Sequence, residues 1–255
     1  MSALHLQFHG EIAELHLDNP DKLNALTVPM LEALETHCHT LENNSDIRVV
    51  LLTAEGEKAF CVGADITAWG GLSPFEFARL WVRDGHRIFN RLTRLPQPTI
   101  AVIEGHAFGG GLELATTCDL RVSSPRATLA LPETSVGVVP GWSGSQRLSD
   151  HMPPAILKEM ALLGNRVSAQ RAYDVGFINE VSEDARATAF EMAEQILTKS
   201  PRATEVTKYM IQAALGEDQN GMIETLGGGL ISASEDKAEG FSAFCEKRKP
   251  IFPGK

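Results

Sequence analysis

Basic residues are scarce in this sequence compared with acidic ones. Its 255 residues include 23 Lys and Arg against 33 Asp and Glu, which gives a formal net charge of −10. This deficit argues against nucleic acid or an anionic membrane as a partner, since both attract basic proteins. A phosphorylated ligand remains compatible with the composition, provided that local basic residues bind it.

Cysteine is also scarce, and its spacing does not fit a metal or redox motif. The four cysteines are Cys38, Cys61, Cys118 and Cys245, with no CxxC pair among them. We expect free thiols in a reducing compartment, buried as small apolar side chains. In the run 37–39 (His-Cys-His), residues two apart point to different faces of a predicted helix, so we expect no metal site there.

Long hydrophobic runs are absent. No stretch approaches the roughly 18 apolar residues of a membrane-spanning helix. The N-terminal segment lacks the basic and apolar regions of a signal peptide. We therefore expect a soluble, cytoplasmic protein, whose 43% hydrophobic content suffices for a large core.

Apolar strands alternate with helical patterns in the first half, which predicts an α/β fold. Residues 3–8 and 11–17 alternate apolar and polar side chains around a His-Gly pair and predict an antiparallel hairpin. Residues 48–53 and 99–103 predict buried strands. Between them, Thr27 is expected to cap a helix. Helices that intervene between strands imply parallel crossovers.

Helical patterns dominate the rest of the chain. They cover residues 74–95, 154–163, 169–175, 185–197 and 201 onward, the last interrupted by three glycines at 227–229. Four aromatic residues, Trp69, Phe75, Phe77 and Trp81, lie in or beside the first of these regions. They are candidates either for the core or for the wall of a ligand pocket.

Three consecutive glycines at 109–111 follow the strand 99–103 and precede a helical pattern. A glycine turn at a helix start exposes backbone N–H groups where the helix dipole is positive, which favours an anion or oxyanion site. Two carboxylates flank it: Glu113 just inside the helix and Glu133 in an apolar loop. Glycines in such turns also serve close packing alone, so the two glutamates carry the catalytic interpretation.

Three motifs make the sequence similar to the crotonase (enoyl-CoA hydratase/isomerase) superfamily. They are AFCVGADI at 59–66, GHAFGGGLELATTCDLRV at 105–122 and LPETSVGVVPGWSGSQRL at 131–148. The resemblance implies a spiral of ββα units over residues 1–198 and a helical trimerisation region over 199–255, in a homotrimer or homohexamer. It also implies a coenzyme A thioester as substrate, with no separate cofactor and no metal ion.

The resemblance also implies roles for individual residues. The backbone N–H groups of Ala64 and Gly110 would form an oxyanion hole for a thioester enolate. Glu113 would position and deprotonate water, and its place near a helix start favours its ionised form. Glu133 would transfer a proton at the carbon α to the carbonyl, with a pKa raised by its apolar surroundings.

Coenzyme A is expected along two loops. By the resemblance, its lining residues are Lys22, Ala25, Ala64, Asp65, Ile66, Thr67 and Gly110. Phe244 and Lys247 match residues that approach the nucleotide in the family, often across a subunit boundary. His106, beside the glycines, either contacts the ligand or has a structural role.

The sequence departs from the family pattern after residues 140–141 (Pro-Gly), where two adjacent glycines are usual. Here Trp142 and Ser143 follow, and the indole either reshapes the acyl pocket or packs outward. The region after LPET also resembles carnitinyl-CoA dehydratases of the same superfamily. We interpret the chain as an enoyl-CoA hydratase or dehydratase. The alternatives are an isomerase that uses only Glu133 and a catalytically silent CoA-binding or assembly subunit.

Overall fold

The computed structural model describes residues 2–255, apart from the side chain at position 220. The chain divides into two compact units, Met1–Pro201 and Arg202–Lys255. The first unit holds two β-sheets with their covering helices, and the second is helical.

The larger sheet has six strands in the order β1-β2-β3-β5-β7-β10. They are β1 (Ala3–His9), β2 (Ile12–Asp18), β3 (Val49–Ala54), β5 (Thr99–Ile103), β7 (Leu120–Ser123) and β10 (Glu180–Val181). Strands β1 and β2 form the expected antiparallel hairpin, and the other neighbours are parallel. The smaller sheet is formed by β4 (Ala59–Cys61), β6 (His106–Phe108), β8 (Thr128–Ala130) and β9 (Val167–Ser168).

From β3 to β8, successive strands belong alternately to the two sheets. Strands β3, β5 and β7 lie in the larger sheet, and the strand that follows each of them, β4, β6 and β8, lies in the smaller one. Helical segments then return the chain to the larger sheet. This repetition is the expected α/β spiral of ββα units.

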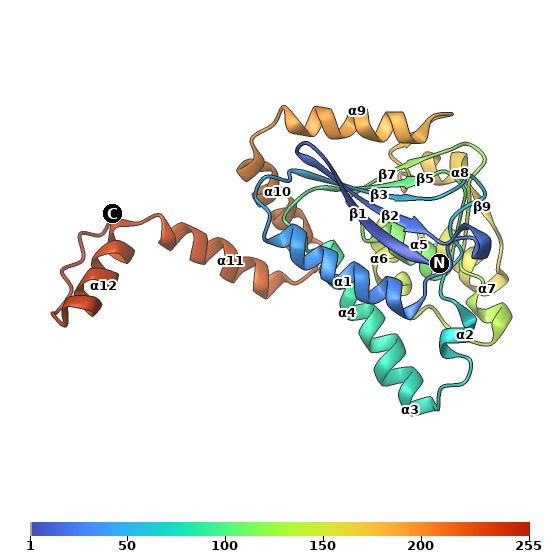
Figure 1. Cartoon of the computed structure of the whole chain (residues 1–255), viewed down its shortest axis with the longest axis horizontal. Coiled ribbons are helices and arrows are strands. Elements are labelled where there is room, and N and C mark those ends of the chain that lie inside the picture. Colours follow the sequence, from blue (N-terminus) through green and yellow to red (C-terminus); the bar gives the residue numbers. More distant parts are fainter. Residues whose placement is uncertain (1) are drawn as a thin grey trace. The chain divides into compact units, whose positions relative to one another are not determined.

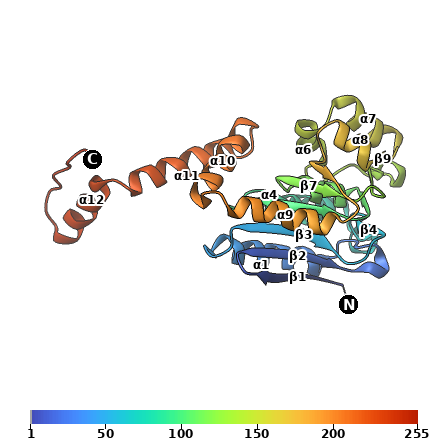
Figure 2. The ribbon, with the colours of Figure 1, turned by 90° about the horizontal axis from the view of Figure 1, so that it is seen from above.

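Both faces of the larger sheet are covered, which explains why its central strands are apolar throughout. Val49 and Leu51 on one face of β3 join a core cluster with Ala189 of α9 (Ala185–Leu197). Val50 and Leu52, on the opposite face, join the main core. Figure 1 shows α9 above the sheet and α1 (Val28–Glu42) below it. Figure 2 shows the strands from above, with α9 in front of them.

The predicted helix over 74–95 is continuous, but its middle is wider than an α-helix. It comprises α3 (Pro74–Glu76), the π-helical segment η2 (Phe77–Val82) and α4 (Arg83–Thr93). Helix α4 lies against α1, which begins at the expected Thr27 cap.

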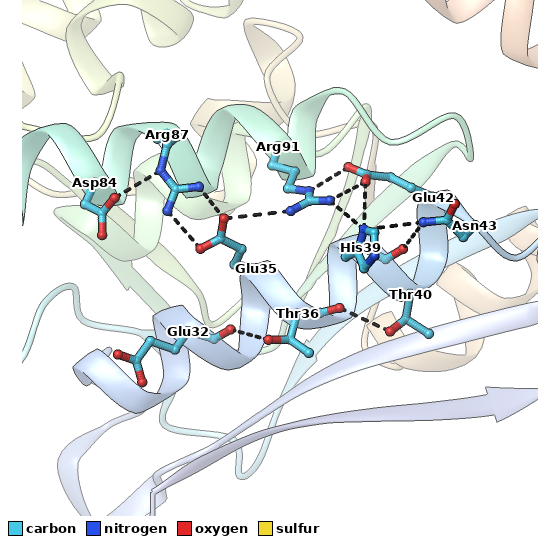
Figure 3. Close-up of polar contacts among 10 residues, drawn as sticks. All are labelled: Glu32, Glu35, Thr36, His39, Thr40, Glu42, Asn43, Asp84, Arg87 and Arg91. Atoms are coloured by element: carbon cyan, nitrogen blue, oxygen red, sulfur yellow. Dashed lines mark hydrogen bonds and ion pairs between the residues drawn. The ribbon is translucent and has the colours of Figure 1, made fainter.

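Charged side chains join α4 to α1, as Figure 3 shows. Arg87 pairs with Glu35 of α1 and with Asp84 of its own helix. Arg91 pairs with Glu42 across 2.6 Å. Exposed ion pairs contribute little stability individually, but this network fixes how α4 is turned relative to α1.

Shorter helices complete the first unit. They are η1 (Pro20–Lys22), α2 (Ile66–Trp69), α5 (Gly110–Thr116), η3 (Glu133–Val136), α6 (Gly144–His151), α7 (Pro154–Leu163) and α8 (Ala169–Asp174). The second unit contains α10 (Pro201–Ala214), whose first residue still belongs to the first unit, with α11 (Gln219–Ser232) and α12 (Glu235–Glu246).

Three expectations were wrong. Helix α11 continues through its three glycines, because a helix-interior glycine costs only about 1 kcal/mol relative to alanine. Strands are not confined to the first half, since β8, β9 and β10 lie in the second; strands of two or three residues are too short to show a pattern. Among the cysteines, Cys245 is exposed, whereas the other three are buried.

None of the helices within residues 2–255 has both the length and the apolar character needed to cross a membrane.

Candidate active site

A cavity of about 180 Å³ lies where four segments of the first unit meet. The segments are 62–69, 77–82, 109–113 and 132–142. Its lining is apolar except for two titratable side chains, Glu113 and Glu133. The lining residues are Val62, Gly63, Ala64, Ile66, Trp69, Phe77, Trp81, Val82, Gly109, Gly110, Glu113, Pro132, Glu133, Val136, Val138, Val139, Gly141 and Trp142.

Glycines allow two loops to touch at one side of this cavity. Gly63 has a φ of +102°, and a Cβ on it would lie 3.2 Å from the backbone nitrogen of Gly110. A Cβ on Gly111 would lie 2.0 Å from the carbonyl oxygen of Cys61. Side chains at these positions would therefore separate the loop after β4 from the start of α5.

Two backbone donors are left free at this contact. Within residues 2–255, neither the N–H of Ala64 nor that of Gly110 donates a hydrogen bond to the protein. Gly110 is the first residue of α5, where the N–H has no partner within the helix. Both residues line the cavity.

The loop that carries Ala64 is held by the segment before α1. Leu26 donates its N–H to the Gly63 carbonyl at 2.8 Å and accepts from the Asp65 N–H at 2.8 Å. The Asp65 side chain accepts from Thr67 at the start of α2 and pairs with Lys22 across 2.8 Å. These contacts, that with Lys22 above all, lower the pKa of Asp65 to about 2.

Glu113 is almost completely buried, with 3% of its surface exposed. Its Oε1 accepts the N–H groups of Trp142 at 2.8 Å and Gly144 at 2.7 Å. Burial raises the pKa of this carboxyl group, while the backbone donors and the nearby Arg147 act in the opposite direction. The helix position was expected to favour the ionised form, but burial is the larger effect.

Glu133 is the first residue of η3 and faces the glycine turn. Its Oε1 lies 2.9 Å from where a Cβ on Gly109 would be, and its buried Oε2 has no hydrogen-bond partner among the described residues. Burial, followed by repulsion from Glu113, raises the pKa of Glu133 to about 7. The direction agrees with the expectation from its apolar surroundings.

Trp142 lies on the inside of the cavity and does not pack outward. Its indole is 3% exposed and contacts the rings of Trp81 and Phe89, each at a centroid distance of 5.1 Å. Trp69 and Phe77 also line the cavity, whereas Phe75 is 67% exposed. The aromatic residues of the 69–81 region thus divide between pocket and surface.

The structure brings four of the predicted site residues together: Ala64, Gly110, Glu113 and Glu133 line one cavity. Ile66 joins them, while Lys22, Ala25, Asp65 and Thr67 lie on the two paired segments beside it. Phe244 and Lys247 belong to the second unit.

The sequence did not predict that five valines line the cavity. They are Val62, Val82, Val136, Val138 and Val139. The only local signal was the alternation of valine with glycine after Glu133, which is also typical of an ordinary turn. His106 bonds Thr128 at 2.9 Å and stacks on Phe108, so its contacts are structural.

The side chains of the run 37–39 on α1 have separate partners or surroundings. His37 bonds the Leu4 carbonyl oxygen, Cys38 is fully buried and His39 contacts Arg91. Among the described residues, no group of three or more His, Cys, Asp or Glu side chains is arranged to hold a metal ion.

Comparisons with known proteins extend over nearly the whole chain. Residues 7–255 match the family model described as enoyl-CoA hydratase/isomerase. The chain is 33% identical over 248 residues to the short-chain-enoyl-CoA hydratase of Clostridium acetobutylicum, covering 96% of this chain and 95% of the relative. It is 34% identical over 263 residues to the carnitinyl-CoA dehydratase of Proteus mirabilis, covering 99% of each. The crystal structure of an enoyl-CoA hydratase from Bacillus anthracis superposes with a TM-score of 0.81 at 32% identity, covering 99% of both chains.

Proposed function

Since the chain belongs to the enoyl-CoA hydratase/isomerase family, we propose that the cavity is the active site of a hydro-lyase. The enzyme adds water to the double bond of an enoyl-CoA thioester, or removes water in the reverse direction. One observation supports this assignment most strongly: two free backbone donors and two carboxyl groups, the buried Glu113 and the partly buried Glu133, belong to residues that line the same apolar cavity.

The free N–H groups of Ala64 and Gly110 bind the thioester carbonyl oxygen. When water attacks the β-carbon, the electron pair of the double bond moves to this oxygen and forms an enolate. One donor of this kind contributes about 2.7–4 kcal/mol to transition-state stabilisation. Because the cavity is apolar, the two dipoles act with little screening by water.

Glu113 is assigned the role of general base. Its Oε1 accepts two backbone N–H groups, and such donors stabilise the ionised form needed to take a proton from water. The water oxygen bonds to the β-carbon, and its proton goes to Glu113. The same residue returns a proton to the leaving hydroxyl group in dehydration.

Glu133 is assigned the role of general acid. Its buried Oε2 has no partner in the described chain, which suits an O–H group that donates into the cavity. An ionised Glu113 nearby favours a protonated Glu133. Glu133 delivers its proton to the α-carbon, which completes the addition of water and neutralises the enolate.

The coenzyme A moiety is assigned to the paired segments beside the cavity. Lys22 is 55% exposed despite its ion pair, so its ammonium group can also meet a phosphate. Ala25, Asp65, Ile66 and Thr67 are assigned to the same binding region, and Ile66 lines the cavity together with Ala64. The reaction consumes only the thioester and water, so coenzyme A is part of the substrate rather than a cofactor.

Residues 199–255 are assigned to assembly into a homotrimer or homohexamer. Phe241 and Phe244 of α12 are 69% and 84% exposed, and Leu230 of α11 is 75% exposed. Apolar side chains so exposed are typical of interaction surfaces. Phe244 and Lys247 would then approach the nucleotide bound to a neighbouring subunit. Mass measurement in solution tests this: an intact chain of monomeric mass would contradict it.

The activity is tested by following loss of the conjugated enoyl-thioester absorbance with a four-carbon enoyl-CoA and identifying the product. Hydration yields the 3-hydroxyacyl-CoA. Glu113→Gln and Glu133→Gln should each lower kcat by about 10²–10⁴, the usual contribution of a general acid or base. Glu104→Gln is a matched control, since Glu104 is another partly buried glutamate with a raised pKa that does not line the cavity.

Two outcomes would redirect the assignment. If a 3-enoyl-CoA is isomerised while Glu113→Gln has no effect, the enzyme is an isomerase that uses Glu133 alone. If acyl-CoA binds without turnover of any enoyl-CoA, the chain is a silent binding subunit.

A further inference from the structure

Trp142 is a buried residue of the cavity lining. Its backbone N–H is used by Glu113, while its indole Nε1 donates to the Trp81 carbonyl oxygen at 3.3 Å. That carbonyl belongs to the π-helical segment η2. π-Turns inside helices frequently mark functional sites. Trp142 is therefore held both by its indole ring and by its backbone N–H.

Two glycines make room for this indole. A Cβ on Gly85 would lie 2.2 Å from Trp142 Nε1, and a Cβ on Gly110 would lie 3.0 Å from the six-membered part of the ring. Neither glycine has a positive φ, so the backbone conformation does not demand glycine. Glycine is needed at both positions because the indole occupies the space next to a Cβ atom there.

The element that carries Gly85 is fixed on two sides. On α4, the neighbouring His86 bonds Ser143 at 2.8 Å, and Asn90 bonds Arg147 at 2.5 Å. The arginine pairs of Figure 3 join α4 to α1. The indole thus packs against a helix that is bonded to its neighbours. These bonds limit how far the indole can move away from a ligand.

The remaining space is small and without positive charge. A cavity of about 180 Å³ is only slightly larger than the ~150 Å³ cavity that accepts one benzene molecule. The lining includes no Lys, Arg or His. A second carboxylate on the acyl group would therefore be buried beside Glu113 and Glu133 without a partner, which is costly.

We propose that Trp142 sets the acyl specificity of the enzyme: its indole is the floor that stops the acyl group, and it restricts the substrate to compact, uncharged acyl chains. The rings of Trp81 and Phe89 pack against the indole, and Gly85 and Gly110 leave the space that it occupies. This inference rests on the proposed function, because it concerns the acyl end of the same site.

The test compares kcat/KM for 2-enoyl-CoA substrates with four, six, eight and ten acyl carbons. Wild type should lose at least about tenfold between four and ten carbons. Trp142→Ala should raise the ratio of the ten-carbon to the four-carbon value by about tenfold or more, and Trp142→Phe should give an intermediate ratio, because burial of each added CH₂ is favourable once space exists. A ratio between two substrates is independent of the fraction of folded enzyme.

Gly85→Ala provides a reciprocal test. Its new methyl group should push the indole into the cavity and lower the six-carbon to four-carbon ratio. In the Trp142→Ala background the same substitution should leave the ratio unchanged, because the clashing atoms are gone.

The outcomes distinguish a failure of the proposed role of Trp142 from a failure of the proposed hydratase function. If wild type hydrates four-carbon and ten-carbon substrates equally well, or if the ratios do not change in Trp142→Ala and Trp142→Phe, the role of Trp142 is wrong and the hydratase assignment stands. If wild type hydrates no substrate of any length, the proposed function fails, and this inference fails with it.

Discussion

The backbone N–H of Trp142 donates a hydrogen bond to Oε1 of Glu113 across 2.8 Å. Under the proposals for this site, one residue therefore serves two purposes. Its backbone holds the base that activates water, and its side chain closes the space where the acyl group ends. A side-chain substitution at this position retains the N–H donor, so specificity can be altered while that contact to Glu113 is kept.

Gly144 makes the second contact to the base, and its missing side chain is required. A Cβ there would lie 2.8 Å from both Cγ and Oε1 of Glu113. We predict that Gly144→Ala displaces the carboxyl group and lowers kcat by about 10²-fold, since misplacing a reacting group by about 1 Å costs that much. Gly71→Ala, in the first unit at a position with open space and without a positive φ, is the control. Steady-state kinetics on both variants test this prediction. An unchanged kcat in Gly144→Ala, or an equal loss of kcat in the control, would count against the role of this contact.

Gly63 tests the oxyanion hole. Alanine at this position would face left-handed backbone strain and a contact of 3.2 Å with the Gly110 nitrogen. We predict a loss of kcat of about 10²–10³, the effect of removing one oxyanion donor. Gly56→Ala carries the comparable strain of a φ of +80° but has its nearest contact at 3.9 Å, with Pro20. Equal kinetic losses in the two variants would mean that backbone strain alone explains the effect.

The hydration rate should depend on pH through Glu133. The acid must be protonated, and its pKa is about 7, so kcat/KM should fall as the pH rises through about 7. On the acid side, kcat/KM should fall as Glu113 takes up a proton. A bell-shaped profile is therefore expected for wild type, and the alkaline limb should vanish from the residual activity of Glu133→Gln. An unchanged alkaline limb in that variant would assign the ionisation to another group.

Lys22 should affect binding of the nucleotide part and not the chemistry. We predict that Lys22→Gln raises KM for an enoyl-CoA several-fold with little change in kcat, as expected when uniform binding is lost. The matching comparison is an enoyl-pantetheine thioester, which lacks the phosphates and should show no such increase. An equal rise in KM for both thioesters would point instead to loss of the Asp65 ion pair and disturbance of the Ala64 loop.

The local geometry around the glycine turn could be predicted from the sequence, because it depends on short-range signals. Glycines at 109–111 between a strand and a helix define a turn with free N–H groups, and Glu113 follows one helical turn later. Thr27 is a cap whatever the rest of the chain does. These features need only a few neighbouring residues.

Other features depend on partners far away in the chain. The direction of the Trp142 indole depends on the space over Gly85, and nothing near either residue reveals that contact. Strands β4, β6 and β8 have three residues each, so only their pairing identifies them. The raised pKa of Glu113 could not be predicted for the same reason, because its burial depends on the segment 141–144 folding over it.

The division of work between the two glutamates is tested most directly by proton exchange at the α-carbon of a saturated butanoyl-CoA in D₂O, followed by NMR at about pH 8, alongside hydration of the four-carbon enoyl-CoA. Exchange needs a base at the α-carbon and the oxyanion hole, but no water attack. The account predicts that Glu113→Gln abolishes hydration and keeps exchange, whereas Glu133→Gln loses both. Loss of exchange in Glu113→Gln with retention in Glu133→Gln would contradict the assigned roles.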